Sequence, residues 1–199
     1  MSEKRVKRPS SEEAEAAVKV LLGWIGEDAE RKGLQRTPAR VLSSFGDWFA
    51  GYNEDPADIL GSSFPDAAGY KEMVALVDID FESHCEHHMA PFIGKAHVAY
   101  MPDKRVVGIS KLVRVVNAYS RRLQVQEKLT QQIAQCIDDV LKPRGVAVIL
   151  EAQHQCMTTR GVYKKNVKMM SSAMLGCFDE EDRPRAEFLS MINNGQGAR

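Results

Sequence analysis

The stretch MVALVDIDFESHCEHHMAP, residues 73–91, joins a strand pattern directly to a cluster of metal-binding residue types. From Met73 to Glu82 apolar side chains alternate with polar ones, which predicts a β-strand with one buried face. The next segment holds one thiol, one carboxylate and three imidazoles in the consecutive positions 84–88. The cluster is therefore expected at the end of a strand or in the loop that follows it.

Cys85 and His88 have the Cys-x-x-His spacing that directs two ligands to one metal ion. Two ligands do not hold zinc alone, and the chain offers one further compact pair, His154 and Cys156. In an extended strand, residues two apart point to the same face, so both members of this pair are available to one site. A set of two thiolates and one imidazole leaves a fourth tetrahedral position for water, as in catalytic zinc sites.

The composition is that of an ordinary globular protein, with 199 residues of which 44% are hydrophobic and 27% charged. Basic and acidic residues number 27 each, so net charge favours neither a nucleic-acid partner nor a membrane surface. Four unevenly spaced cysteines favour a reducing compartment over a disulfide scaffold. No apolar run has transmembrane length, and residues 1–9 lack the core of a signal peptide. We therefore expect a cytoplasmic protein whose residues 1–9 form a disordered tail.

Two helices are predicted ahead of the strand. Ser10 and Glu13 form a capping box for the first helix, and Gly33 is its expected C-cap. Thr37 and Pro38 are typical of the start of the second helix. Residues 51–72 are rich in Gly, Pro, Asp and Ser, which predicts a long connection.

Strands and helices also alternate through the rest of the chain. Further strands are expected over residues 92–101, 146–156 and 167–178, with helices capped by Ser110, opened by Gln126 and closing the chain at 182–192. Strands linked by a hairpin pair antiparallel, so this order predicts an α+β fold with an antiparallel sheet.

Several polar residues have two interpretations from their local context. Lys111 and Arg114 share one face at the start of a helix, which is equally typical of a solvated basic surface and of a phosphate site. Arg40 is either a solvated charge or an anion ligand. A structural role is expected for Cys136, on a helical core stripe, and for Cys177, within a predicted strand. His97 lies in the middle of a predicted strand and is expected to be either structural or a surface residue.

Four segments together resemble the motif series of the GTP cyclohydrolase I family. They are CEHH (residues 85–88), GISKLVR (108–114), QVQE (124–127) and HQCMTTRG (154–161), in the family's order and spacing. The resemblance extends from about residue 10 to residue 192. It implies an enzyme that converts GTP and water to 7,8-dihydroneopterin triphosphate and formate, the first step of pterin biosynthesis on the way to folate or tetrahydrobiopterin.

The same resemblance implies the tunnelling fold, a four-stranded antiparallel sheet with two helices on one face, preceded by an N-terminal helical pair. It divides the chain into a helical segment and connection at 10–72, a catalytic domain at 73–192 and a flexible tail at 193–199. Several sheets would close into a barrel, and two five-membered rings would stack as a homodecamer with active sites between subunits.

The resemblance also implies roles for individual residues. It assigns Cys85, His88 and Cys156 to Zn²⁺, and makes His87 and His154 candidate acid/base groups, because imidazole exchanges protons near neutral pH. A second set would bind GTP: Glu127 accepts the N1 and 2-amino hydrogens of guanine beside Gln126, while the triphosphate meets Ser110, Lys111, Arg114, Arg160 and, from a neighbouring subunit, Arg40.

Other protein classes fit part of this pattern. Pyruvoyl-tetrahydropterin synthases share the fold but bind zinc through three histidines, and nitrile reductases use a nucleophilic cysteine and NADPH. A scaffold protein with a closed structural zinc site would need a fourth protein ligand, which His84 or His87 could supply. None of these classes needs Glu127, Lys111 and Arg160 in register with the metal motif.

Overall fold

The computed structural model describes residues 7–61 and 72–196, and the chain divides into two compact units, Met1–Trp48 and Phe49–Arg199. The first unit contains helices α1 (Ser11–Trp24) and α2 (Thr37–Trp48). The predicted capping box of α1 is confirmed: the Glu13 N–H donates to Ser10 Oγ at 3.2 Å, and the Ser10 N–H donates to Glu13 Oε2 at 2.8 Å.

The predicted end of α1 at Gly33 is wrong, because the helix already ends at Trp24. Gly26 has φ of +92° just beyond that point. The Glu27 N–H donates to the Leu22 carbonyl and the Gly26 N–H to the Gly23 carbonyl, which is the Schellman pattern of a helix end. Glycine adopts this left-handed conformation without a side-chain clash, so the chain leaves the helix there.

The second unit begins with two short helices where a long connection was expected. A 3₁₀ helix covers Ala50–Asn53, and α3 covers Pro56–Gly61. Leu60 is fully buried and the Ala57 N–H donates to Asp55 Oδ1, so an apolar anchor and a side-chain cap stabilise α3. The remainder of the expected connection, residues 62–71, lies outside the described residues.

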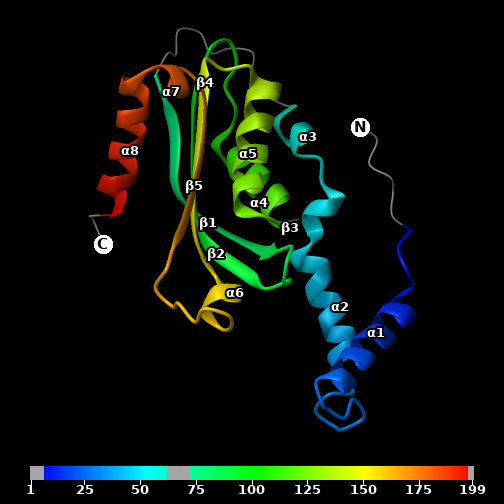
Figure 1. Ribbon diagram of the computed structural model, residues 1–199. Helices are drawn as coiled ribbons and strands as arrows, with labels where there is room; N and C mark the ends of the chain where they lie inside the picture. Colours follow the sequence, from blue (N-terminus) through cyan, green and yellow to red (C-terminus); the bar gives the residue numbers. More distant parts are fainter. Residues whose placement is uncertain (1–6, 62–71, 197–199) are drawn as a thin grey trace. The chain divides into compact units, whose positions relative to one another are not determined.

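The α+β class is confirmed, and the sheet has five strands in the order β3-β1-β2-β4-β5 (Figure 1). Four long strands are antiparallel neighbours: β1 (Val74–Cys85), β2 (Pro91–Met101), β4 (Gly145–His154) and β5 (Met169–Gly176). The fifth, β3 (Leu123–Gln124), pairs parallel with β1 at His84 and Cys85. A strand of two residues is too short to show alternation in the sequence, so only the four long strands were predicted.

Helices cover both faces of this sheet. One core lies under α4 (Ile109–Ser120) and α5 (Gln126–Leu141) and includes Phe92, Val98 and Leu150. A second core lies under α8 (Asp182–Gln196) on the opposite side, as Figure 1 shows, and includes Ile149 and Phe188. Alternate strand residues therefore enter different cores, and α4 and α5 define the side on which the candidate site is built.

Some element ends differ from the sequence prediction. Helix α4 is capped by Gly108 and not by Ser110. The strand expected over 146–156 ends at His154, where the short helix α6 (Gln155–Thr158) begins, and the strand expected over 167–178 ends before α7 (Cys177–Glu180). Such ends depend on tertiary packing, which a local pattern does not contain. Among the helices described, none is long and apolar enough to cross a membrane.

His97 lies on β2 and is buried, with 1% of its surface exposed, which favours the structural over the surface interpretation. Its Nδ1 accepts a hydrogen bond from the Asp78 N–H at 3.1 Å. Asp78 has φ of +59° at an irregularity between Leu76 and Ile79, so this bond holds a bulged segment of β1. Burial lowers the pKa of His97, an effect that Lys95 reinforces and that Asp78 and Glu151 oppose.

We expect the free energy of unfolding to fall as pH drops below the ordinary histidine pKa of 6.5. Because the folded-state pKa of His97 is lowered, the unfolded chain binds the proton first, and this residue's contribution is at most about 1.4 kcal/mol per pH unit. His97→Asn keeps an acceptor for the Asp78 N–H and removes the titration. Urea unfolding between pH 7.5 and 5 should show a shallower decline for the variant, and parallel curves would contradict the expectation.

Candidate active site

The end of β1 and the turn after it place two of the predicted metal ligands together. The Met89 N–H donates to the Cys85 carbonyl at 2.8 Å, and the Cys85 N–H donates to the Ala90 carbonyl at 2.9 Å. Met89 adopts φ of +52°, so the chain reverses within a few residues and returns as β2. The Glu86 N–H donates to the Gln124 carbonyl, which ties the turn to β3. These bonds present Cys85 and His88 from one tight turn.

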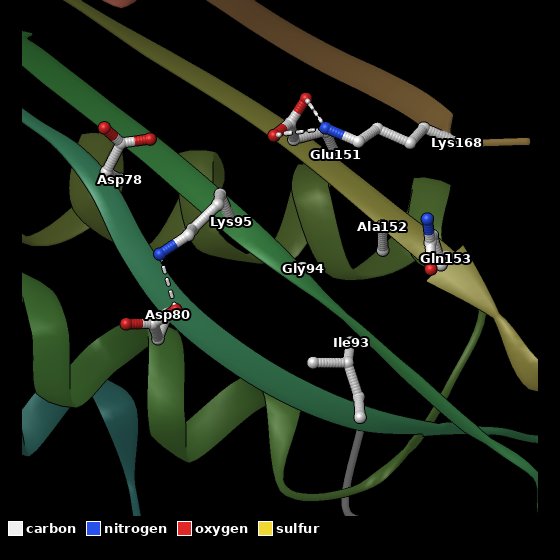
Figure 2. Close-up of a pocket in the computed structure, with 9 residues that line it drawn as sticks. All are labelled: Asp78, Asp80, Ile93, Gly94, Lys95, Glu151, Ala152, Gln153 and Lys168. Carbon is white, nitrogen blue, oxygen red and sulfur yellow. Dashed lines mark hydrogen bonds and ion pairs between the residues drawn. The ribbon is translucent and has the colours of Figure 1, made fainter. Parts of the chain in front are cut away.

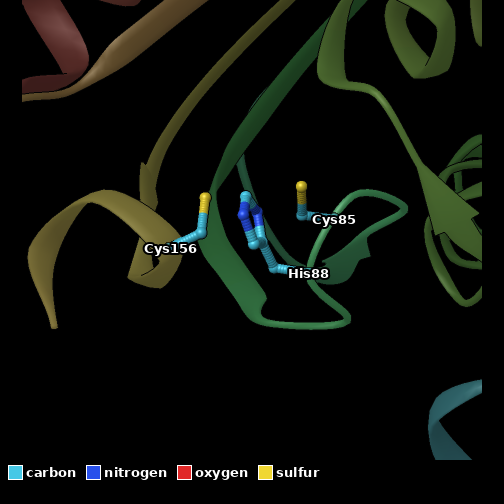
Figure 3. A group of neighbouring side chains, drawn as sticks. All are labelled: Cys85, His88 and Cys156. Atoms are coloured by element: carbon cyan, nitrogen blue, oxygen red, sulfur yellow. The ribbon is translucent and has the colours of Figure 1, made fainter. Parts of the chain in front are cut away.

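The third predicted ligand, Cys156, lies in α6 directly after the end of β4. His154 pairs with Phe92 at the start of β2, so the residues that follow β4 lie beside the turn at 85–88. The ligand atoms of Cys85, His88 and Cys156 all lie within 4.8 Å of one another, and Figure 3 shows the three side chains converging. In residues 7–61 and 72–196 no other group of three or more His, Cys, Asp and Glu side chains gathers in this way.

The chemistry of this group suits a thiophilic metal. Two sulfurs and one imidazole nitrogen are a donor set typical of zinc, and tetrahedral bonds of about 2.0–2.3 Å require ligand atoms roughly 3.3–3.8 Å apart. Ligand atoms that lie within 4.8 Å of one another would approach by up to about 1 Å to meet this requirement. Burial raises the pKa of the Cys156 thiol, and the neighbouring Cys85 raises it further, so a cation between the two sulfurs would stabilise their thiolate forms.

Two further predicted residues adjoin the metal ligands. His87 Nδ1 lies 3.8 Å from Cys85 Sγ, and the exposed Arg160 places Nη1 3.1 Å from His88 Nε2. An arginine side chain donates hydrogen bonds and does not accept them, so the His88 nitrogen is the acceptor in this contact. The structure thus brings a second imidazole and a fixed positive charge to the edge of the cluster.

His154 is held from two sides. Its ring stacks on Phe92 with centroids 4.5 Å apart and planes inclined by 4°, and its Nε2 lies 2.8 Å from Gln126 Oε1. Burial lowers the pKa of His154, while the carboxylate of Glu127 opposes this shift. Glu127 is exposed in the first turn of α5. An imidazole with a fixed orientation, a nearby carboxylate and a metal-type cluster therefore occupy one end of the sheet.

The predicted phosphate-binding residues do not all join this group within one chain. Ser110 and Lys111 lie in the first turn of α4, whereas the other end of that helix leads to β3 beside Cys85. At 1.5 Å per residue, α4 separates these two ends by about 15 Å. Arg114 lines a hollow with three acidic side chains, Glu54, Asp55 and Asp58. Arg40 is exposed on α2 of the N-terminal unit, so its role as a phosphate ligand stays a prediction.

A second hollow lies on the sheet face turned away from α4 and α5 (Figure 2). Four of its charged side chains form two ion pairs, Lys95 with Asp80 at 2.6 Å and Lys168 with Glu151 at 3.4 Å, and Asp78 lines it as well. Neighbouring strand residues point to opposite faces, so this hollow is separate from the face that carries His154. It adds no group to the candidate site.

Sequence reasoning missed the two contacts that orient His154. Phe92 was identified only as the start of a strand, and Gln126 as a substrate-binding residue beside Glu127. Alternation in the sequence assigns Phe92 and His154 each to one face of its own strand. Only the pairing register shows that these two residues lie opposite each other. The partners of Gln126 on β4 and β5 are equally long-range, so no local signal reveals them.

Comparison with known proteins gives consistent similarities. A family model described as GTP cyclohydrolase I matches residues 14–193. The chain is 50% identical over 185 residues to a protein named GTP cyclohydrolase 1 from Maricaulis maris (strain MCS10), and the match covers 93% of this chain and 90% of that protein. Proteins of the same name from Bartonella henselae and Brucella suis are each 50% identical over 186 residues, which is 94% of this chain and 90% and 87% of theirs.

We expect purified protein to bind roughly one Co²⁺ ion per chain at the Cys85, His88 and Cys156 cluster, with the absorption bands of a cobalt–thiolate site. Cys156→Ala should abolish these bands, because it removes one of two sulfur donors. Cys177→Ala is the matched control, since it deletes a buried thiol that is not in the cluster. Unchanged cobalt spectra in Cys156→Ala would show that the metal binds elsewhere.

Proposed function

This chain belongs to the GTP cyclohydrolase I family, and we propose that it converts GTP and water to 7,8-dihydroneopterin triphosphate and formate, the first step of pterin biosynthesis. The observation that carries the proposal is the convergence of Cys85, His88 and Cys156 beside an immobilised His154. The pyruvoyl-tetrahydropterin synthase alternative has three histidines on the metal, which this cluster does not provide.

Cys85, His88 and Cys156 would hold zinc, since their donor atoms match its preference and no fourth protein ligand lies in the cluster among the described residues. When bound, zinc supplies a Lewis acid that lowers the pKa of water held at the open position. The alternative of a closed structural zinc site needs a fourth ligand. His87 Nδ1 lies 3.8 Å from Cys85 Sγ, but it does not belong to the gathered group.

Glu127 would select guanine. Its carboxylate accepts two parallel hydrogen bonds, and guanine presents adjacent donors at N1 and at the 2-amino group. Adenine lacks this donor pair, so ATP would leave the carboxylate without partners and be excluded. Glu127 is close enough to His154 to influence its pKa. Anchoring guanine at Glu127 would therefore keep the ring within reach of the imidazole that exchanges its protons.

His154 and His87 would carry the proton transfers. Water adds at C8 of guanine, the five-membered ring opens, and C8 leaves as formate. The ribose then opens, rearranges to a ketone and condenses with the freed amine to close the pterin ring. Each step moves a proton on or off nitrogen or oxygen, for which imidazole is suited near neutral pH. The lowered pKa of His154 keeps it neutral at pH 7, ready to accept a proton first.

The triphosphate would be bound with the help of a neighbouring chain. Arg160 adjoins the metal ligands, but Ser110 and Lys111 lie at the far end of α4. A second copy that presents its own α4 would complete the site. Within the described residues, β5 has a neighbour on one side only, and β3 covers just the end of the outer edge of β1. Pairing of such edges between copies would give the barrel of the tunnelling fold, and we propose the homodecamer on this basis.

The first test is turnover of GTP by zinc-loaded protein, with formate and the pterin product measured separately. We expect both in equal amounts. Glu127→Gln should lower kcat/KM by ~100-fold or more, because the amide presents a donor toward the guanine donors. Lys128→Gln, the adjacent exposed position, is the control. Formate without pterin would contradict the ring-closure assignment, and no formate would overturn the proposed function.

A second test asks whether sites are shared between chains. Lys111→Ala and His154→Ala should each be nearly inactive as pure assemblies. If Lys111 and His154 act at one site from different chains, co-assembled mixtures should regain up to about a quarter of wild-type activity, since some sites receive both intact residues. Native mass spectrometry would verify the mixing. Verified mixed assemblies without recovered activity would contradict the shared site.

A further inference from the structure

The Gln126 side chain is 1% exposed and has a partner at each polar atom. Its Nε2 lies 3.2 Å from the Leu150 carbonyl, 3.1 Å from the Met169 carbonyl and 3.1 Å from Ser171 Oγ. Its Oε1 lies 2.8 Å from His154 Nε2. This residue at the start of α5 therefore joins β4 and β5 to the imidazole, in addition to standing beside Glu127 in the sequence.

The direction of these hydrogen bonds follows from the acceptors. Two of the Nε2 partners are carbonyl oxygens, which cannot donate, so the amide NH₂ must face them. The opposite amide orientation would place Oε1 against two carbonyl oxygens in a buried place. The orientation of the Gln126 amide is thus determined by β4 and β5, and its oxygen must point to His154.

The hydroxyls nearby are consistent with the same direction. Thr130 Oγ1 lies 2.7 Å from the Gln126 carbonyl and 2.7 Å from Ser171 Oγ. Since a carbonyl only accepts, Thr130 donates to Gln126 and accepts from Ser171. Ser171 has then used its proton, so its oxygen is a third acceptor that shares the two Gln126 Nε2 hydrogens with the carbonyls of Leu150 and Met169. The hydroxyl protons of Thr130 and Ser171 therefore have defined places.

The contact between Gln126 Oε1 and His154 Nε2 consequently requires a proton on the histidine nitrogen. With the proton on Nδ1 instead, two lone pairs would face each other at 2.8 Å. A neutral histidine carries one proton on its two ring nitrogens, so a proton held on Nε2 leaves Nδ1 as the acceptor. Stacking on Phe92 fixes the plane of the same ring. Both the tautomer and the orientation of His154 are therefore set by neighbours that belong to the core.

We propose that Gln126 is a positioning residue that keeps the proton of neutral His154 on Nε2, so that Nδ1 is the atom through which His154 exchanges protons with the substrate. The proposal rests on the proposed function and deepens it. It assigns the Gln126 side chain a role other than guanine binding, because a contact with the base would cost it bonds to buried carbonyls.

Neutron diffraction from crystals of the wild-type protein grown in D₂O at about pH 8, where histidine is neutral, tests the tautomer directly. We expect deuterium on His154 Nε2 and none on Nδ1, with the Gln126 amide deuterons directed at the carbonyls of Leu150 and Met169. Deuterium on Nδ1 with a bare Nε2 would overturn the proposal. This measurement needs no turnover, so it holds its meaning if GTP proves not to be the substrate.

Kinetics of Gln126→Met test the consequence, because methionine matches glutamine in length and cannot accept the hydrogen bond. We expect kcat to fall by ~100-fold with KM changed by less than about threefold, the signature of a misdirected acid/base group. Gln131→Met, the same exchange at an exposed position of α5, should match the wild type. A raised KM with unchanged kcat would overturn the proposal and indicate guanine binding.

Discussion

The pairing register between β2 and β4 is the constraint on which the candidate site depends. Strand β2 begins directly after the turn that carries Cys85 and His88, and β4 ends at His154, two residues before Cys156. The register sets Phe92 opposite His154, which brings both halves of the metal cluster to one end of the sheet. A slip of one residue would turn His154 to the other face and withdraw Cys156 from its partners. The hydrogen bonds between β2 and β4 thus fix the distance between Cys156 and the turn that carries Cys85 and His88.

Because successive side chains of a strand point to opposite faces, the two faces of the sheet carry different functional groups. Phe92 and His154 lie on the side of α5, which contributes Gln126 to the imidazole. Their neighbours Ile93 and Gln153 belong to the opposite hollow, which is lined by two ion pairs and by Asp78. One face therefore combines a buried polar network with a metal-type cluster, and the other presents charged side chains, four of them in ion pairs. This separation follows from alternation alone, so a single substitution on one face leaves the other largely intact.

Local patterns in the sequence predicted most of the fold and three candidate metal ligands. Alternation identified four strands, and the spacings 85–88 and 154–156 identified three side chains that the structure brings together. Other features depend on distant partners. Strand β3 exists because residues 123–124 pass beside the end of β1, and α3 exists because Leu60 is buried by later segments. The same reason explains why the partners of Gln126 were missed: Leu150, Met169 and Ser171 are separated from it by more than 20 residues.

Tertiary structure, and not residue type, separates the two thiols that could bind metal from the other two cysteines. Cys136 and Cys177 are buried, and burial raises their pKa, so they remain protonated and pack as small apolar side chains. Burial also raises the pKa of Cys156, and Cys85 raises it further, because the register places the two sulfurs together. Repulsion between neighbouring thiolates is relieved by a shared cation, whereas an isolated buried thiol gains nothing from one. The ladder that aligns β2 with β4 therefore creates the electrostatic condition that would favour a bound cation, as well as the geometry of the candidate site.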